Sequence, residues 1–283
     1  MKFLPILLCF ATAGLSWATD LVCCGGEEVF LIDPANPGLK KWTWKASDSP
    51  SIPQDWHRKF RSTDDCKPYE DGAVLITSSS SGVALVDMNT KKCLFLAESR
   101  NAHSACLLPG GQVAVAASHG GDAMHFYDLG SRELVQAIYL TGAHGAVWDG
   151  GRQCLWGLGT FDLLRIEQED GKWAVACRSR LPSRGGHDLS TSYNPCGELL
   201  VTSNTEVFLF NKDTGKFRLH EVLGPERVVK SVDQHPASHR VVWHQAAKGG
   251  WWSDTIRFVG GEDLVLEGER LYKVRWNVPL ARP

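Results

Sequence analysis

Six basic or imidazole side chains recur along the sequence at intervals of about 40 residues. They are Lys67, His103, His144, His187, Lys230 and Lys273. The intervals between them are 36, 41, 43, 43 and 43 residues. One histidine near a strand end is usually a structural group, but three at matching positions, with lysines at the other three, indicate a binding or catalytic site. We therefore expect all six side chains to converge on one funnel.

These residue types suit the binding of an anion. Lys67, Lys230 and Lys273 are cationic at neutral pH, and Arg275 lies two residues beyond Lys273, on the same face of its strand. A carboxylated ligand, such as a uronic-acid sugar, would be attracted to such a funnel. Several cations in one place also lower one another's pKa, which is how a Lys or His becomes a general base near neutral pH.

A metal site is the alternative use of the same histidines. The imidazoles of His103, His144 and His187 with an open fourth position would form a catalytic site for zinc or another divalent transition metal. Asp188 would then orient one of the rings. The nearby lysines oppose this arrangement because they repel a dication.

Aromatic and acidic residues add to both hypotheses. The stretch "GGWWSDTIRF" (249–258) predicts a loop that exposes an aromatic ring, and we expect Trp252 to contact a sugar face there. Other large aromatics are expected to fill the wedge between repeats. Asp64, Asp65 and Glu70 flank Lys67 and would supply a carboxylate pair of the glycosidase kind. The remaining histidines, such as His119, are expected to be surface or structural residues.

The elements that position these residues form a repeat of about 40 residues. Apolar runs that end in an acidic or amide residue and a turn recur as "EVFLIDPANPG" (28–38), "GVALVDMNTKK" (82–92), "AMHFYDLGSRE" (123–133) and "EVFLFNKDTGK" (206–216). Each is preceded and followed by another short strand, with almost no helical periodicity. Short strands at this spacing indicate an all-β sandwich, barrel or propeller. Four strands in each repeat favour a β-propeller with six four-stranded antiparallel blades.

The two ends of the chain predict how the ring closes. The C-terminal "RLYKVRWNV" is a single strand with no repeat after it, and the segment 21–46 supplies three strands with no first strand before them. We expect the C-terminal strand to be the innermost strand of the N-terminal blade, because both would otherwise have exposed edges. The six repeated residues would then stand at the starts of the innermost strands, around one mouth of the central channel.

The first nineteen residues have the pattern of a secretory signal peptide. Lys2 precedes an apolar run, and the segment ends in Ser16, Trp17 and Ala18. We therefore expect a secreted, monomeric protein in which residues 20–283 form a single propeller domain. A net charge of −2 with well-mixed signs argues against a nucleic-acid partner. No later apolar segment reaches the roughly 18 residues of a membrane helix, so no membrane association is expected.

Eight cysteines follow the predicted signal peptide. An even number in an exported chain permits disulfides, and we expect at least one. No pairs are assigned, because buried free thiols are also common in apolar strands. The adjacent Cys23 and Cys24 would either form an unusual ring or be two reduced thiols in the core.

Several short motifs carry a resemblance to a known family. They are "RSTDDCKP" (61–68), "NAHSACLLPGG" (101–111), "HGAVWD" (144–149), "GGHDL" (185–189), "VKSVDQHP" (229–236), "WWSDTIRF" (251–258) and "GERLYKVRW" (268–276). With these motifs the chain resembles a family of exported propeller proteins known mainly as a domain of unknown function. In architecture alone it also resembles propeller polysaccharide lyases, and that resemblance implies His, Arg, Lys or a His-bound metal at the channel mouth and uronate-containing substrates.

The leading functional hypothesis is a secreted carbohydrate-active enzyme of the lyase type. The lysines and Arg275 would neutralise the carboxylate of a uronic-acid unit in an anionic glycan or another small carboxylated ligand, and one of the three histidines would abstract a proton without a cofactor. A non-catalytic propeller that binds a ligand or a protein is one alternative. A metal-dependent hydrolase or lactonase that uses His103, His144 and His187 is the other.

Overall fold

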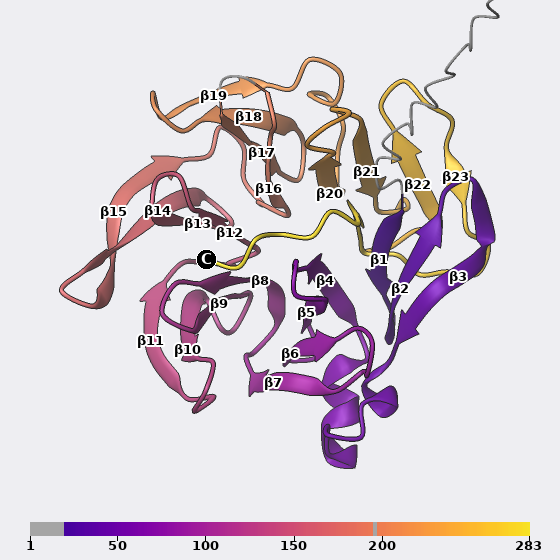
Figure 1. Cartoon of the computed structure of the whole chain (residues 1–283). Coiled ribbons are helices and arrows are strands. Elements are labelled where there is room, and N and C mark those ends of the chain that lie inside the picture. Colours follow the sequence, from indigo (N-terminus) through magenta and orange to yellow (C-terminus); the bar gives the residue numbers. More distant parts are fainter. Residues whose placement is uncertain (1–19, 195–196) are drawn as a thin grey trace, which may run out of the picture.

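The computed structural model describes residues 20–194 and 197–283, so the predicted signal peptide lies outside the described residues. Within them the chain forms six four-stranded sheets arranged as a ring around a central axis (Figure 1). Every pairing between neighbouring strands of a sheet is antiparallel. The predicted six-bladed β-propeller is therefore confirmed.

The strands of the six blades are as follows. The first blade contains β1 (Leu21–Gly25), β2 (Glu28–Asp33), β3 (Asn36–Trp44) and β24 (Lys273–Trp276). The second contains β4 (Thr63–Pro68), β5 (Ala73–Ser78), β6 (Gly82–Asp87) and β7 (Cys93–Glu98). The third contains β8 (Ala102–Leu108), β9 (Gln112–Ala117), β10 (Ala123–Asp128) and β11 (Leu134–Tyr139).

The other three blades follow the same order. The fourth contains β12 (Gly145–Asp149), β13 (Cys154–Leu158), β14 (Asp162–Glu169) and β15 (Lys172–Arg180). The fifth contains β16 (Leu189–Thr191), β17 (Glu198–Thr202), β18 (Val207–Asn211) and β19 (Lys216–Leu219). The sixth contains β20 (Val229–Gln234), β21 (Val241–Gln245), β22 (Thr255–Phe258) and β23 (Leu264–Val265).

Two short 3-10 helices, η1 (Ala46–Asp48) and η2 (Gln54–Phe60), lie between the first blade and the second. Phe60 at the end of η2 is buried and packs edge-on against Trp44 of β3, with ring centroids 5.4 Å apart. Within the described part of the chain, no helix has the length and apolar character needed to cross a membrane.

The repeated apolar runs end as their sequences predict. The acidic or amide residue that closes each run accepts a hydrogen bond from a backbone amide of the following turn, which is the reason Asp and Asn favour this position. The amide donors, at 2.7 to 2.9 Å, belong to Ala35, Thr90, Ser131 and Thr214.

The apolar core lies between neighbouring blades. One cluster joins Val22 of the first blade to Ile76 of the second, and another joins Leu21 of the first blade to Val242 of the sixth. Most cysteines are buried in these layers, and all seven cysteines of the described residues are free. The predicted disulfide is therefore wrong for this part of the chain, and Cys196 lies outside it. Cys23 and Cys24 are two reduced thiols.

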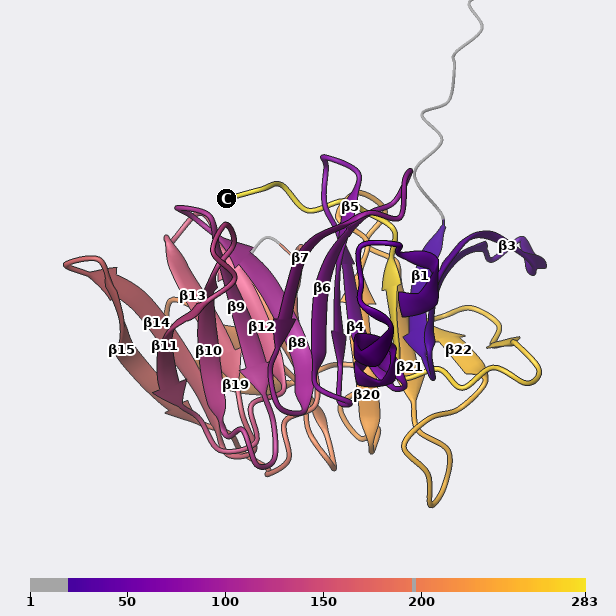
Figure 2. The ribbon, with the colours of Figure 1, turned by 90° about the horizontal axis from the view of Figure 1, so that it is seen from below.

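The C-terminal strand closes the ring as expected. β24 pairs antiparallel with β1, with Lys273 opposite Cys24 and Trp276 opposite Leu21. The segment after β24 then crosses the face of the ring above the central axis (Figure 1), and the side view places it over one end of the propeller (Figure 2). There Leu280 exchanges backbone hydrogen bonds with Pro68 and Glu70 at 2.8 and 3.0 Å.

Deletion of residues 270–283 should unfold the whole domain rather than fray one end. The first blade would lose its innermost strand, and β1 would become an unpaired edge inside the ring. A matched chain that lacks only residues 279–283 keeps all of β24 and should still unfold cooperatively. Circular dichroism during thermal unfolding measures both. A cooperative transition in the chain that lacks residues 270–283 would show that β24 does not close the ring.

Candidate functional site

A β-bulge stands at the start of three innermost strands. The strand pairing shifts register at Asp64 in β4, at His103 in β8 and at Lys230 in β20. A bulged residue has no partner on the neighbouring strand, and the local bend changes the direction of its side chain. The bulges therefore give these three side chains a different direction from the strand residues that follow them.

Six side chains, one from each blade, form what we call the mouth ring. The bulged residues are joined by His144, His187 and Tyr272, which lie just before β12, β16 and β24. In chain order the ring is Asp64, His103, His144, His187, Lys230 and Tyr272. The intervals are 39, 41, 43, 43 and 42 residues. All six line a cavity of about 680 Å³ that we call the funnel.

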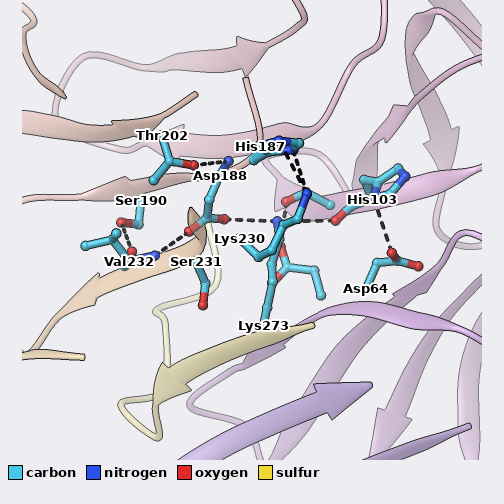
Figure 3. A network of polar contacts seen from close by, with 12 residues as sticks. Asp64, His103, His187, Asp188, Ser190, Thr202, Lys230, Ser231, Val232 and Lys273 are labelled. Carbon is cyan, nitrogen blue, oxygen red and sulfur yellow. Dashed lines mark hydrogen bonds and ion pairs between the residues drawn. The ribbon is translucent and has the colours of Figure 1, made fainter. Parts of the chain in front are cut away.

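The residue that follows each ring member belongs to a second layer, deeper in the channel. This layer contains Asp65, Asp188 and Lys273, and all three are buried. Lys273 Nζ lies 2.9 Å from Asp188 Oδ1 and 3.9 Å from Asp65 Oδ2. Figure 3 shows the contact of Lys273 with Asp188 beside that of Lys230 with His187. Lys273 is thus an ion-pair partner inside the channel and does not line the funnel.

Arg275 completes this buried network. Its Nε lies 2.7 Å from Asp65 Oδ1, and its Nη2 lies 2.8 Å from Asp188 Oδ1. Burial raises the pKa of both carboxyls, but the charge of Arg275, followed by that of Lys273, outweighs it and holds the pKa of Asp65 and Asp188 below the usual range. Asp188 therefore pairs with two cations and does not orient a histidine ring as predicted.

Lys67 lies further along the channel still. Its Nζ donates hydrogen bonds to Ser104 Oγ and to the carbonyl oxygens of Ala105 and Ala146, at 3.0, 2.9 and 2.6 Å. Lys67 and Arg275 line a separate cavity of about 350 Å³. The prediction that all six repeated residues converge on one funnel is therefore wrong for Lys67 and Lys273, and Arg275 also lies outside the funnel. In β4 the bulged Asp64 takes the position at the mouth, three residues before Lys67, and in the first blade Tyr272 takes it, one residue before Lys273.

The three histidines do come together, as predicted. The rings of His103 and His144 stack with centroids 4.1 Å apart and an interplanar angle of 21°, and His187 meets His144 edge-on at 5.6 Å. Stacked rings direct their nitrogen atoms side by side and not at one point. Among the described residues no group of three or more His, Cys, Asp or Glu side chains is arranged to hold a metal ion. This geometry gives the metal-dependent alternative no support.

Two of the histidines are neutral at pH 7. Burial, together with the charges of His103 and His187, lowers the pKa of His144 well below its usual value. Burial and the charge of Lys230 lower the pKa of His187 to about 3. Lys230 is itself affected, because burial and the charge of Lys273 lower its pKa to about 8. Its Nζ lies 3.3 and 3.4 Å from the two ring nitrogens of His187.

His103 differs from the other two because it has a carboxylate partner. Its Nδ1 lies 3.3 Å from Asp64 Oδ1 and 3.3 Å from the Tyr272 hydroxyl oxygen. Asp64 in turn accepts a hydrogen bond from the amide of Ser79. Burial raises the pKa of Tyr272 well above 10, so the phenol keeps its proton at neutral pH. The Asp64 carboxylate and the Tyr272 hydroxyl both contact Nδ1 and so hold the orientation of the His103 ring.

The rim of the funnel is rich in cations. Four cationic side chains line it, against the single carboxylate of Asp64. They are Arg61, Arg184, Lys230 and Arg270. None of the four forms an ion pair with a carboxylate elsewhere in residues 20–194 and 197–283. The funnel therefore carries an excess of positive charge.

Aromatic rings stand beside these cations. Trp251 and Trp252 are 71% and 40% exposed, as the Gly-Gly-Trp-Trp stretch predicts, and both line the funnel. The guanidinium of Arg270 lies 4.5 Å from the Trp252 ring, and Lys230 Nζ lies 5.0 Å from the Trp251 ring. Of the predicted substrate-binding residues, Lys230 and Trp252 thus lie together with the three histidines.

The sequence predicts only some of the funnel residues. Asp64 is expected only as part of a carboxylate pair and Tyr272 is not singled out, although both have intervals close to the repeat. His119, predicted to be an ordinary histidine, lines the funnel and meets the His144 ring edge-on at 5.9 Å. The rim arginines also follow the repeat, since Arg61 and Arg184 each stand three residues before a ring member and Arg270 stands two residues before Tyr272.

Comparisons with known proteins agree on the fold. The model of the family DUF6528, described as a family of unknown function, matches residues 25–281. No curated protein matches the chain. Among solved structures, the hydrazine synthase of Kuenenia stuttgartiensis is similar, with a TM-score of 0.59 and 14% identity over 82% of this chain and 70% of that chain. At this identity the likeness concerns the fold alone.

The neutral state of His187 predicts a loss of stability in mild acid. The folded-state pKa of about 3 lies below the ordinary 6.5, so the unfolded chain takes up a proton that the folded chain cannot. Stability should fall as the pH drops from about 6.5 towards 3, by about 2 kcal/mol between pH 7 and pH 5 from this group. Urea unfolding at both pH values should show a smaller drop for His187→Gln. An unchanged drop would mean that folding does not lower the pKa of His187.

Proposed function

The chain belongs to the family of unknown function DUF6528, and we propose that it binds a carboxylated carbohydrate in the funnel and cleaves it by elimination at a uronic-acid unit. The observation that carries this proposal is the excess of cations in the funnel, where none of the four has a carboxylate partner among the described residues. A cavity of about 680 Å³ also falls in the usual range for small-molecule sites.

Lys230 is the strongest argument for an anionic ligand. The side chain is completely buried, and its neighbours are His187 and the faces of Trp251 and Tyr272. A buried ammonium without a counter-ion is costly, and this cost lowers its pKa. A ligand carboxylate would supply the missing charge, and Arg61, Arg184 and Arg270 at the rim would attract it.

The aromatic rings favour a sugar over a simple organic acid. Trp252 is exposed beside Arg270, and Phe161 lies below the guanidinium of Arg180 at 4.6 Å. Both rings line the funnel. Each would stack against the apolar face of a sugar ring, and beside Trp252 the guanidinium of Arg270 would pair with a carboxylate. An exported protein, which residues 1–19 predict, would meet such glycans outside the cell.

The arrangement of His103, Tyr272 and Lys230 supports elimination as the reaction. Lys230 would neutralise the carboxylate and so acidify the proton on the adjacent carbon. His103 Nε2 takes that proton, the bond to the glycosidic oxygen breaks as a carbon–carbon double bond forms, and the leaving oxygen takes a proton from Tyr272. All bonds and charges balance without an oxidant or a metal. The low pKa of His187 makes it a weak base, which narrows the predicted trio to His103.

Loss of the buried ammonium should abolish ligand binding. In Lys230→Met the affinity for a uronate-containing oligosaccharide, measured by calorimetry, should fall by about 100-fold, because a buried charge pair is lost. Lys230→Arg keeps the charge and should bind within about tenfold of the native protein. Lys216→Met, at an exposed lysine of β19, is the matched control and should not change affinity. If no uronate glycan of a broad panel binds, the proposed function is wrong.

Substitutions at the proton-transfer residues should separate turnover from binding. His103→Ala and Tyr272→Phe should lower kcat for unsaturated-sugar formation, measured by absorbance, by about 100-fold or more, with affinity nearly unchanged. Trp252→Ala should do the reverse and weaken affinity by about fivefold to tenfold at similar kcat. Tight binding without any unsaturated product would refute the elimination step and leave a ligand-binding propeller.

A further inference from the structure

A second cavity lies at the opposite end of the channel. It has a volume of about 350 Å³ and shares no lining residue with the funnel. The buried layer of Asp65, Asp188 and Lys273 lies between the two. The C-terminal segment, yellow in Figures 1 and 2, passes over this end of the ring, and its residues from Val278 to Pro283 form part of the wall.

The walls of this second cavity are largely aromatic and aliphatic. Trp148 and Trp276 contribute rings, and Leu107, Leu189 and Leu280 contribute aliphatic groups. This volume and composition suit a molecule of one or two aromatic rings.

The cations at the bottom of the cavity do not select an anion. Arg275 is neutralised by Asp65 and Asp188 at 2.7 and 2.8 Å. The three protons of the Lys67 ammonium are directed at Ser104 and two backbone carbonyls. In this respect the second cavity differs from the funnel, where the cations are unpaired.

One polar group of the cavity has unused hydrogen-bonding capacity. Asp233 Oδ2 accepts a hydrogen bond from the backbone amide of Trp276 at 2.8 Å. No residue of the described chain donates a hydrogen bond to Oδ1. Burial raises the pKa of Asp233 to about 7, which reflects how poorly its charge is compensated. A hydrogen-bond donor on a bound molecule would stabilise the charge of the Asp233 carboxylate at Oδ1.

We propose that the second cavity is a binding site for a small aromatic heterocycle whose ring N–H donates a hydrogen bond to Asp233 Oδ1. The ring packs between Trp148, Trp276 and the aliphatic wall. The segment 279–283 covers the ligand on the solvent side, held in place by the hydrogen bonds of Leu280 and by the ion pair of Arg282 with Asp71. This site is independent of the proposed function, since it uses none of the funnel residues.

Indole and indene test the proposal on the unaltered protein. The two molecules have nearly the same size and shape, and only indole has an N–H. We expect calorimetry above pH 8, where Asp233 is ionised, to show that indole binds about tenfold more tightly than indene, the difference expected for one hydrogen bond to a charged acceptor. Equal affinities, or no binding of either probe at millimolar concentration, would overturn the proposal.

Two variants locate the site. In Asp233→Asn the amide oxygen can still accept from the Trp276 amide, but an NH₂ group then faces the cavity, so the preference for indole should disappear. The chain that lacks residues 279–283 should bind indole at least about fivefold more weakly, because it loses one wall. His103→Ala, in the funnel, is the control and should bind indole as the native protein does. An indole preference that survives Asp233→Asn would place the binding elsewhere and refute the site.

Discussion

The buried ion-pair layer of Asp65, Asp188, Lys273 and Arg275 is the interaction on which the rest of the structure depends. Its members come from β4, β24 and the residue before β16, so it joins the second and fifth blades to the strand that closes the ring. Removal of one partner from such a network leaves a buried charge uncompensated, at a cost of about 3–5 kcal/mol. The layer also fills the middle of the channel. One continuous channel is thereby divided into two cavities with different chemistry.

The β-bulges explain how one sequence repeat supplies both a buried network and a functional surface. In a regular strand, successive residues alternate between two faces, so neighbours such as His103 and Ser104 could not both point along the channel. The extra residue at Asp64, His103 and Lys230 breaks this alternation and sends each of these side chains to the mouth. Pairing resumes at the residue after each bulge, and that residue belongs to the deeper layer. Three of the six members of the mouth ring thus stand where the strand pairing is irregular.

The sequence alone predicts the fold well, because the fold follows from local patterns. Strand length, turn residues and a period of about 40 residues predict six blades. The incomplete sets of strands at the two ends of the chain predict how the ring closes. The site is predicted only in part. The positions of the three histidines and Lys230 at the funnel are predicted because these residues follow the repeat. That of Trp252 is predicted because it lies in a loop that two glycines mark in the sequence. Lys67 is misplaced because the bulge in β4 puts Asp64 at the mouth, and Lys273 and Arg275 are misplaced because Tyr272, one residue before β24, holds that position. The partner of Arg275, Asp65, is 210 residues away, and no local pattern predicts such a pair.

The contrast between the two lysines of the channel shows how the fold separates structure from function. Lys230 and Lys273 are both completely buried, and Lys273 lowers the pKa of Lys230. Lys273 has Asp188 at 2.9 Å, so its charge is stabilised by the protein itself. Lys230 forms no ion pair among the described residues, and the charge of Asp64 compensates its burial only in part. The proposed ligand carboxylate would supply the missing partner. A buried cation in this state destabilises the empty protein, and selection retains such groups mainly where activity requires them. Burial lowers the pKa of Lys230, and it also excludes water. An anion that reaches Lys230 would therefore interact with it more strongly than with a surface lysine.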